Sequence, residues 1–144
     1  MFSVSQSTTI RAVLSRTIHG TAIIPLMRLF AQTLELKDDP ALIAEYRKQH
    51  RAVWPEVAGA LRSIGIRSMR IFLQGNRLFM IFEADDSFDP SRDFQSYTQT
   101  ARCREWDELM RTFQQQVPGA REGEWWTPME EVFDLSWCRD QGGV

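Results

Sequence analysis

Tyr46 and His50 are the residues of this sequence best suited to acid-base chemistry, because they lie four positions apart. In a helix this spacing places the two side chains on one face, one above the other. The same face would carry the apolar residues Leu42, Ile43, Val53, Trp54, Val57, Leu61 and Ile64. We therefore expect the phenol and the imidazole to point toward the interior. An imidazole, with an unperturbed pKa of about 6.5, can both give and take a proton near neutral pH.

Pro55 follows His50 by five positions and removes one backbone donor from the predicted helix. Its ring also crowds the carbonyl near Arg51, so the helix should kink or restart just after His50. We expect the kink to open a space beside the imidazole. A second interpretation is a packed histidine whose ring is satisfied by a backbone carbonyl.

The elements that would position this pair follow the order β, α, β, β, α, β. A helix is expected from Asp39 as N-cap and Pro40 as first residue to about Ser63, where Gly65 ends it. Strands are predicted at 27–36, 66–73, 78–84 and 129–135, and helical structure in two pieces at 93–116. Gly75-Asn76 would form the turn of a hairpin between the second and third strands.

This order predicts an α+β fold of the ferredoxin-like type, a four-stranded antiparallel sheet with helices on one face. The other face would be left uncovered, and the strand at 66–73 carries large apolar side chains in both directions. We therefore expect two copies to pair through their sheets as a homodimer, a dimeric α/β barrel.

The chain of 144 residues has room for one domain, predicted at 27–136. Residues 1–26 contain no Asp or Glu, and they carry arginines and many hydroxyl side chains. This composition is typical either of a mitochondrial or plastid transit peptide or of a leader that has no targeting function. Residues 137–144 are expected to be a tail. Without a targeting role for the leader, the protein is expected in the cytoplasm.

Composition narrows the choice of partners. The net charge of −2, with no long run of Lys or Arg, argues against binding nucleic acid or membranes by bulk electrostatics. Cys103 and Cys138 form no CxxC pair and have no histidines at metal-ligand spacing, so no metal site is predicted. A small molecule or another protein is the expected partner.

The helix motif at 45–56, Glu-Tyr-Arg-Lys-Gln-His-Arg-Ala-Val-Trp-Pro-Glu, resembles that of the L-rhamnose mutarotase family, small dimeric α+β-barrel proteins that interconvert sugar anomers. The resemblance extends over about residues 28–135. It is supported by the segments at 61–65, 103–106 and 130–133.

The resemblance implies a role for five positions. His50 would be the proton donor, Tyr46 a sugar contact, and Trp106 the first of two tryptophans in the site. Met69 stands where the family has a substrate-binding tyrosine, and Asp107 stands in place of the second tryptophan. Asp107 could accept hydrogen bonds from sugar hydroxyls, act as the base, or be a solvated helix residue, and Trp106 could equally belong to the core. Trp125 and Trp126 could fold over the pocket.

We therefore predict a mutarotase that acts on a 6-deoxy hexose, L-rhamnose first and L-fucose next, by acid-base ring opening and closure. That chemistry requires neither a metal ion nor a redox cofactor. Two alternatives remain: a noncatalytic sugar-binding protein of the same fold, in which Met69 and Asp107 mark a drifted site, and a cofactor-free monooxygenase of related fold.

Overall fold

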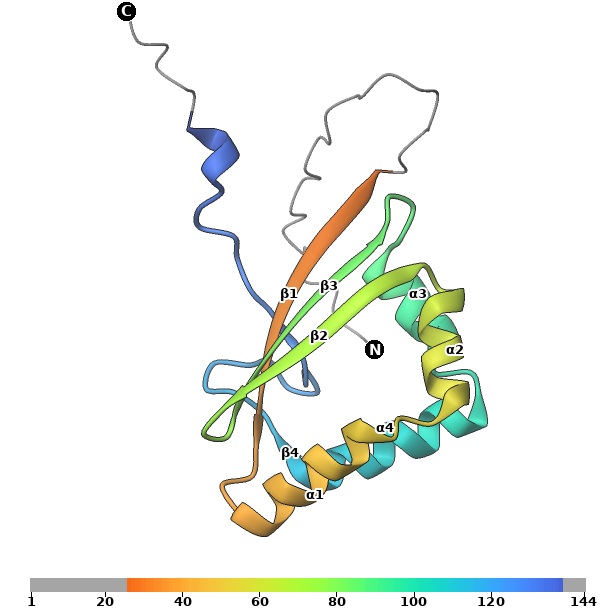
Figure 1. The fold of residues 1–144 in the computed structure, drawn as a ribbon, viewed down its shortest axis with the longest axis vertical. Helices are drawn as coiled ribbons and strands as arrows, with labels where there is room; N and C mark the ends of the chain where they lie inside the picture. Colours follow the sequence, from red (N-terminus) through yellow and green to blue (C-terminus); the bar gives the residue numbers. More distant parts are fainter. Residues whose placement is uncertain (1–25, 139–144) are drawn as a thin grey trace, which may run out of the picture.

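The computed structural model describes residues 26–138, which form an antiparallel sheet with helices on one side (Figure 1). Strand β1 (Met27–Leu36) pairs along one edge with β3 (Arg77–Asp85), and β3 pairs with β2 (Ile66–Gln74). The other edge of β1 pairs with the short strand β4 (Gln114–Gln115). The resulting order, β2-β3-β1-β4, is that of a ferredoxin-like sheet and confirms the predicted fold class.

Two helix pairs join the strands and cover the same face of the sheet (Figure 1). Helices α1 (Pro40–Arg51) and α2 (Pro55–Ser63) connect β1 to β2, and α3 (Pro90–Tyr97) and α4 (Ala101–Phe113) connect β3 to β4. The main core lies between the two layers. Its most deeply buried side chains are Leu34, Leu36, Val57, Leu78 and Cys103.

Helix α1 begins where the sequence predicts. The Asp39 carboxylate accepts hydrogen bonds from the backbone N–H groups of Ala41 (2.8 Å) and Leu42 (3.3 Å), and Pro40 is the first helical residue. Of the two outcomes expected after His50, a kink or a restart, the structure shows a restart as a second helix. Because Pro55 cannot donate to the preceding turn, α1 ends at Arg51 and α2 starts at Pro55.

The hairpin between β2 and β3 has the predicted turn. Gly75 has a φ of +59°, in the left-handed region that glycine enters without a steric penalty. The next residue, Asn76, attaches the hairpin to the end of β1: its backbone oxygen accepts from the Leu36 N–H at 2.7 Å, and its Nδ2 donates to the Leu36 oxygen at 2.9 Å.

The predicted strand at 129–135 is wrong. Beside β1, the place of a long fourth strand is filled by two short pieces, β4 and β5 (Thr127–Pro128). After the Met129 N–H donates to the Ala31 oxygen, the chain leaves the sheet (Figure 1). It turns into a 3-10 helix at Leu135–Trp137, which the Asp134 side chain caps by accepting from the Ser136 N–H at 2.8 Å. The aspartate therefore ends the extended run that the apolar pattern suggested.

The proposed leader at 1–26, apart from Leu26, and most of the tail at 137–144 lie outside the described residues. Between residues 26 and 138, no helix is long and apolar enough to cross a lipid bilayer. The predictions for the leader, the domain limits and the compartment remain predictions.

Candidate active site

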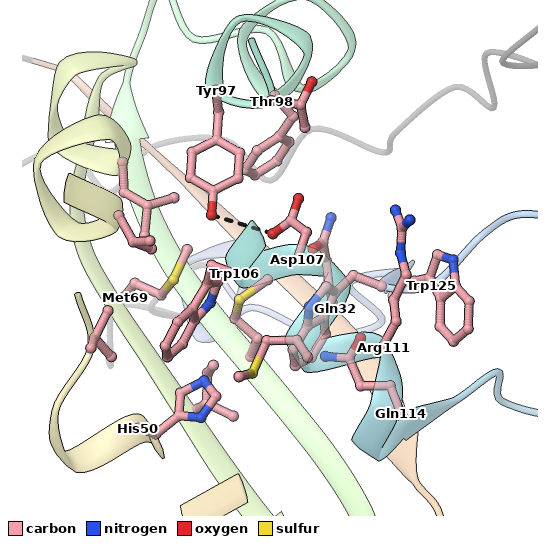
Figure 2. Close-up of a pocket in the computed structure, with 18 of the residues that line it drawn as sticks. Gln32, His50, Met69, Tyr97, Thr98, Trp106, Asp107, Arg111, Gln114 and Trp125 are labelled. Atoms are coloured by element: carbon pink, nitrogen blue, oxygen red, sulfur yellow. Dashed lines mark hydrogen bonds between the residues drawn. The ribbon is translucent and has the colours of Figure 1, made fainter. Parts of the chain in front are cut away.

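A cavity of about 360 Å³ lies between the helices and the inner face of the sheet. All five residues singled out in the sequence line it: Tyr46, His50, Met69, Trp106 and Asp107. They come from three elements, α1, β2 and α4, and Figure 2 shows four of them by name around the space. The structure thus brings the predicted residues together, while their roles remain predictions.

His50 lies in the last turn of α1, and its Nδ1 is 3.1 Å from the backbone oxygen of Tyr46. Because a carbonyl can only accept, Nδ1–H donates this hydrogen bond, and Nε2 is the basic nitrogen of the neutral ring. Burial lowers the pKa of His50 below its usual value, although the bond to the Tyr46 oxygen acts in the opposite direction. The imidazole is therefore neutral at pH 7 and ready to take a proton.

Two aromatic side chains fix the plane of this imidazole. The Tyr46 ring lies against it, with 4.1 Å between ring centroids, and the Trp106 ring meets it edge to face at 5.5 Å. Trp106 in turn packs edge to face on Trp54 at 5.3 Å, and the Arg102 guanidinium lies 3.8 Å above the Trp54 ring. This row of contacts crosses from α1 to α4 and holds His50 in one orientation.

Tyr46 is only 4% exposed, and burial raises the pKa of its hydroxyl above the ordinary value for tyrosine. The hydroxyl therefore stays protonated and can donate. Within the part of the chain that the structure describes, no protein group forms a hydrogen bond with it. A ligand in the cavity could use this donor, as the sequence prediction requires.

Asp107 faces the same cavity from α4, and its Oδ1 accepts a hydrogen bond of 3.3 Å from the Tyr97 hydroxyl (Figure 2). Burial raises the pKa of this carboxyl, while the Tyr97 bond and the positive charge of Arg111 lower it. The structure thus rejects the interpretation of Asp107 as a fully solvated helix residue.

The rest of the lining divides into apolar and polar groups. The apolar group includes Met69, as expected, together with Val53, Val57, Leu61, Ile71, Met80, Met110 and Phe94. Trp125 and Trp126, from the long connection before β5, also line the cavity, which is one of the arrangements that the sequence allowed. The polar group is Gln32, Tyr97, Thr98, Asp107, Arg111 and Gln114.

Sequence reasoning missed most of the polar group. Tyr97 belongs to no motif in the sequence, and its hydroxyl reaches Asp107 because the turn between α3 and α4 brings the two helices together. Gln32 lies on the same face of β1 as the buried Phe30 and Leu34, two positions from each, and this spacing is a signal for an inward side chain.

Comparison with known proteins agrees with this geometry. The family model of L-rhamnose mutarotase matches residues 29–135. A UPF0734 protein of Dictyostelium discoideum is 53% identical over 116 residues, which span 78% of this chain and 93% of that protein. An L-fucose mutarotase of Xanthomonas campestris is 38% identical over 112 residues, 76% of this chain and 90% of the relative.

The solved structures give the same fold. The crystal structure of an L-rhamnose mutarotase from Formosa agariphila matches with a TM-score of 0.55, covering 74% of this chain and 96% of the other. At 23% sequence identity this likeness supports the fold alone. The matches to the family model and to close relatives go further, and by them the chain belongs to the L-rhamnose mutarotase family.

Proposed function

We propose that this member of the family is a mutarotase that interconverts the α and β anomers of a 6-deoxy hexose, with His50 as the catalytic residue. The observation that supports this most is the position of the His50 imidazole, which Tyr46 and Trp106 hold on the wall of a cavity large enough for a small ligand.

The reaction needs one group that first takes a proton and then returns it. Nε2 of His50 accepts the proton of the anomeric hydroxyl, the O–H electron pair forms the C1=O1 double bond, and the bond from C1 to the ring oxygen breaks. The imidazolium then donates its proton to the ring oxygen and gives the open aldehyde. After rotation about C1–C2, the same steps in reverse close the ring on the other face. A positioned acid-base group accelerates such a reaction about 10²- to 10⁴-fold.

The shape of the lining supports a 6-deoxy sugar. Met69, Ile71 and their apolar neighbours offer a surface for a methyl group but no partner for a primary hydroxyl. The named relatives include both L-rhamnose and L-fucose mutarotases. We rank L-rhamnose first as the substrate and L-fucose next.

We also propose that the protein works as a homodimer. The sheet face away from the helices carries a stacked pair, Phe72 and Phe79, whose ring centroids lie 6.1 Å apart, and Phe72 is 52% exposed. Ile81 lies on the same face, since it alternates with the buried Met80 and Phe82. A second copy would cover these side chains. Sedimentation of the wild type as a monomer at micromolar concentration would contradict this proposal.

The test of the activity is saturation-transfer NMR on L-rhamnose and on L-fucose at anomeric equilibrium, with and without the protein. We expect the protein to increase the exchange rate of at least one of the two sugars. Binding of a sugar without any increase in exchange would instead identify the noncatalytic sugar-binding alternative.

A further inference from the structure

Three polar residues of the cavity lining take no part in the proton transfers proposed for His50. Tyr97 closes α3, Asp107 lies on α4, and Gln114 follows directly after α4. In Figure 2, Asp107 and His50 lie on opposite sides of Trp106. Asp107 is therefore poorly placed to act on the atoms that react at His50, and it needs a different role.

The hydrogen bonds of Asp107 leave much of its accepting capacity unused. An ionised carboxylate can accept about four hydrogen bonds, and the structure gives Asp107 one, from the Tyr97 hydroxyl at 3.3 Å. Within residues 26–138, no Lys or Arg nitrogen lies within 4.0 Å of its oxygens. A partly buried carboxylate with so few donors is costly for the protein, as its raised pKa also indicates.

Gln114 shows the same pattern independently. Its residue is only 7% exposed, it lines the cavity, and it is the one polar residue among the most buried residues of the described chain. No protein hydrogen bond of its carboxamide is found between residues 26 and 138. An amide offers both a donor and an acceptor, and a ligand in the cavity could use both. Two polar groups that face one cavity and have unused hydrogen-bonding capacity favour a polar ligand.

We propose that Asp107 holds hydroxyl groups of the sugar that are remote from its anomeric carbon, that Tyr97 is the positioning residue of the Asp107 carboxylate, and that Gln114 contacts a further polar group of the same ligand. The inference rests on the proposed function for the identity of the ligand as a sugar. It adds the residues that would form hydrogen bonds with the hydroxyl groups of that sugar. His50 and these polar residues line the same cavity, and Trp106 lies between His50 and Asp107 in Figure 2.

This arrangement defines the class of ligand. A carboxylate accepts hydrogen bonds through two oxygens, which suits two neighbouring hydroxyls of an uncharged pyranose. A sugar acid or a sugar phosphate would bring a negative charge toward Asp107 and would be rejected. The Tyr97 hydroxyl remains protonated, since burial and the Asp107 charge both raise its pKa, and it holds Oδ1 so that the rest of the carboxylate can face the ligand.

The experiment is isothermal calorimetry with L-rhamnose and L-fucose and with their 3-deoxy and 4-deoxy analogues. Four proteins are compared: the wild type, Asp107→Asn, Tyr97→Phe and the control Glu108→Gln, which changes the exposed neighbouring acid on the same helix. On the better-binding parent sugar, we expect Asp107→Asn to weaken the affinity about 10- to 100-fold and Tyr97→Phe about 2- to 10-fold. Glu108→Gln should leave it unchanged.

The analogues separate recognition from a merely structural effect. The wild type should bind weakly to an analogue that lacks the recognised hydroxyl. For that analogue, Asp107→Asn should lower the affinity less than twofold further. In Tyr97→Phe, the pKa of Asp107, followed by NMR, should rise because the ionised carboxylate loses a donor. Thermal melting shows whether each variant is folded.

The outcomes keep this inference apart from the proposed function. Binding with these losses but without anomer exchange would refute the mutarotase and leave the recognition site standing. Equal losses on parent and deoxy sugars, an Asp107→Asn variant that binds like the wild type, or no binding of either sugar by the wild type would overturn the inference.

Discussion

Acidification should destabilise the folded protein through His50 in a way that one substitution can isolate. The imidazole is partly buried among Tyr46 and Trp106, and burial lowers its pKa below the value of about 6.5 that the unfolded chain has. At a pH between the two pKa values, the unfolded state therefore binds a proton that the folded state does not. The contribution of the neutral His50 to the free energy of unfolding is fully present above pH 6.5. It is lost as the pH falls toward the pKa of His50 in the folded protein.

The magnitude follows from one proton. Where the unfolded chain is protonated at this position and the folded chain is not, the free energy of unfolding changes by about 1.4 kcal/mol per pH unit. For a domain of this size, each kcal/mol corresponds to about 3–6 °C in Tm. The Tm of the wild type should thus fall between pH 7 and the pKa of the folded imidazole, beyond any common loss from the carboxylates.

The assay is thermal unfolding of the wild type and His50→Gln from pH 7.5 to 4.5. Because glutamine does not titrate, the variant should lose less stability over this range, and the difference between the two curves should grow as the pH falls below 6.5. NMR titration of the His50 ring gives its pKa directly. A measured pKa at or above 6.5, or two stability curves that stay parallel, would refute the reasoning.

Three further predictions concern stability and are checked by thermal melting. Asp107→Asn should keep or raise the Tm at pH 7 and lose that advantage at acid pH. The reason is that folding raises the pKa of the Asp107 carboxyl, so its ionised form lowers the stability of the folded protein above the pKa of the unfolded chain. A Tm of the variant about 5 °C below that of the wild type at pH 7 would contradict this. Arg102→Met should lower the Tm by about 2–5 °C, mainly through loss of the cation–π contact with Trp54 and also through loss of the exposed ion pair with Glu105, and a Trp54→Leu background should reduce the effect. Gly65→Ala should lower it by about 4–10 °C, since Gly65 has a φ of +102° and a new Cβ would lie 3.3 Å from the Asp85 carboxylate; an unchanged Tm would refute this strain.

Local signals in the sequence predicted the scaffold well. Asp39 with Pro40 starts α1, and Gly75 supplies the turn of the hairpin, because each of these residues acts on backbone geometry within a few positions. The inward direction of Tyr46 and His50 also followed from helical spacing, and the structure places both at the cavity.

Features that depend on tertiary contacts were not predictable in the same way. The run from Met129 to Leu135 has the apolar content of a strand, yet it leaves the sheet after Met129 and ends in a short helix that Asp134 caps. The partnership of Tyr97 with Asp107 crosses a helix-helix turn, and the burial of Gln114 depends on where β4 joins β1. Neither has a period or a motif in the sequence, so the part of the site that would read hydroxyls became visible only in three dimensions.

The most direct test of the account is the rate of anomer exchange on L-rhamnose and L-fucose, measured by saturation-transfer NMR with wild type, His50→Gln and Lys48→Gln. Lys48 is the matched control, since its exposed side chain lies on the same helix two residues earlier. We predict that the wild type and Lys48→Gln accelerate exchange equally, and that His50→Gln lowers the acceleration at least about 100-fold. A His50→Gln variant as fast as the wild type, or a wild type no faster than buffer on both sugars, would contradict the role assigned to His50.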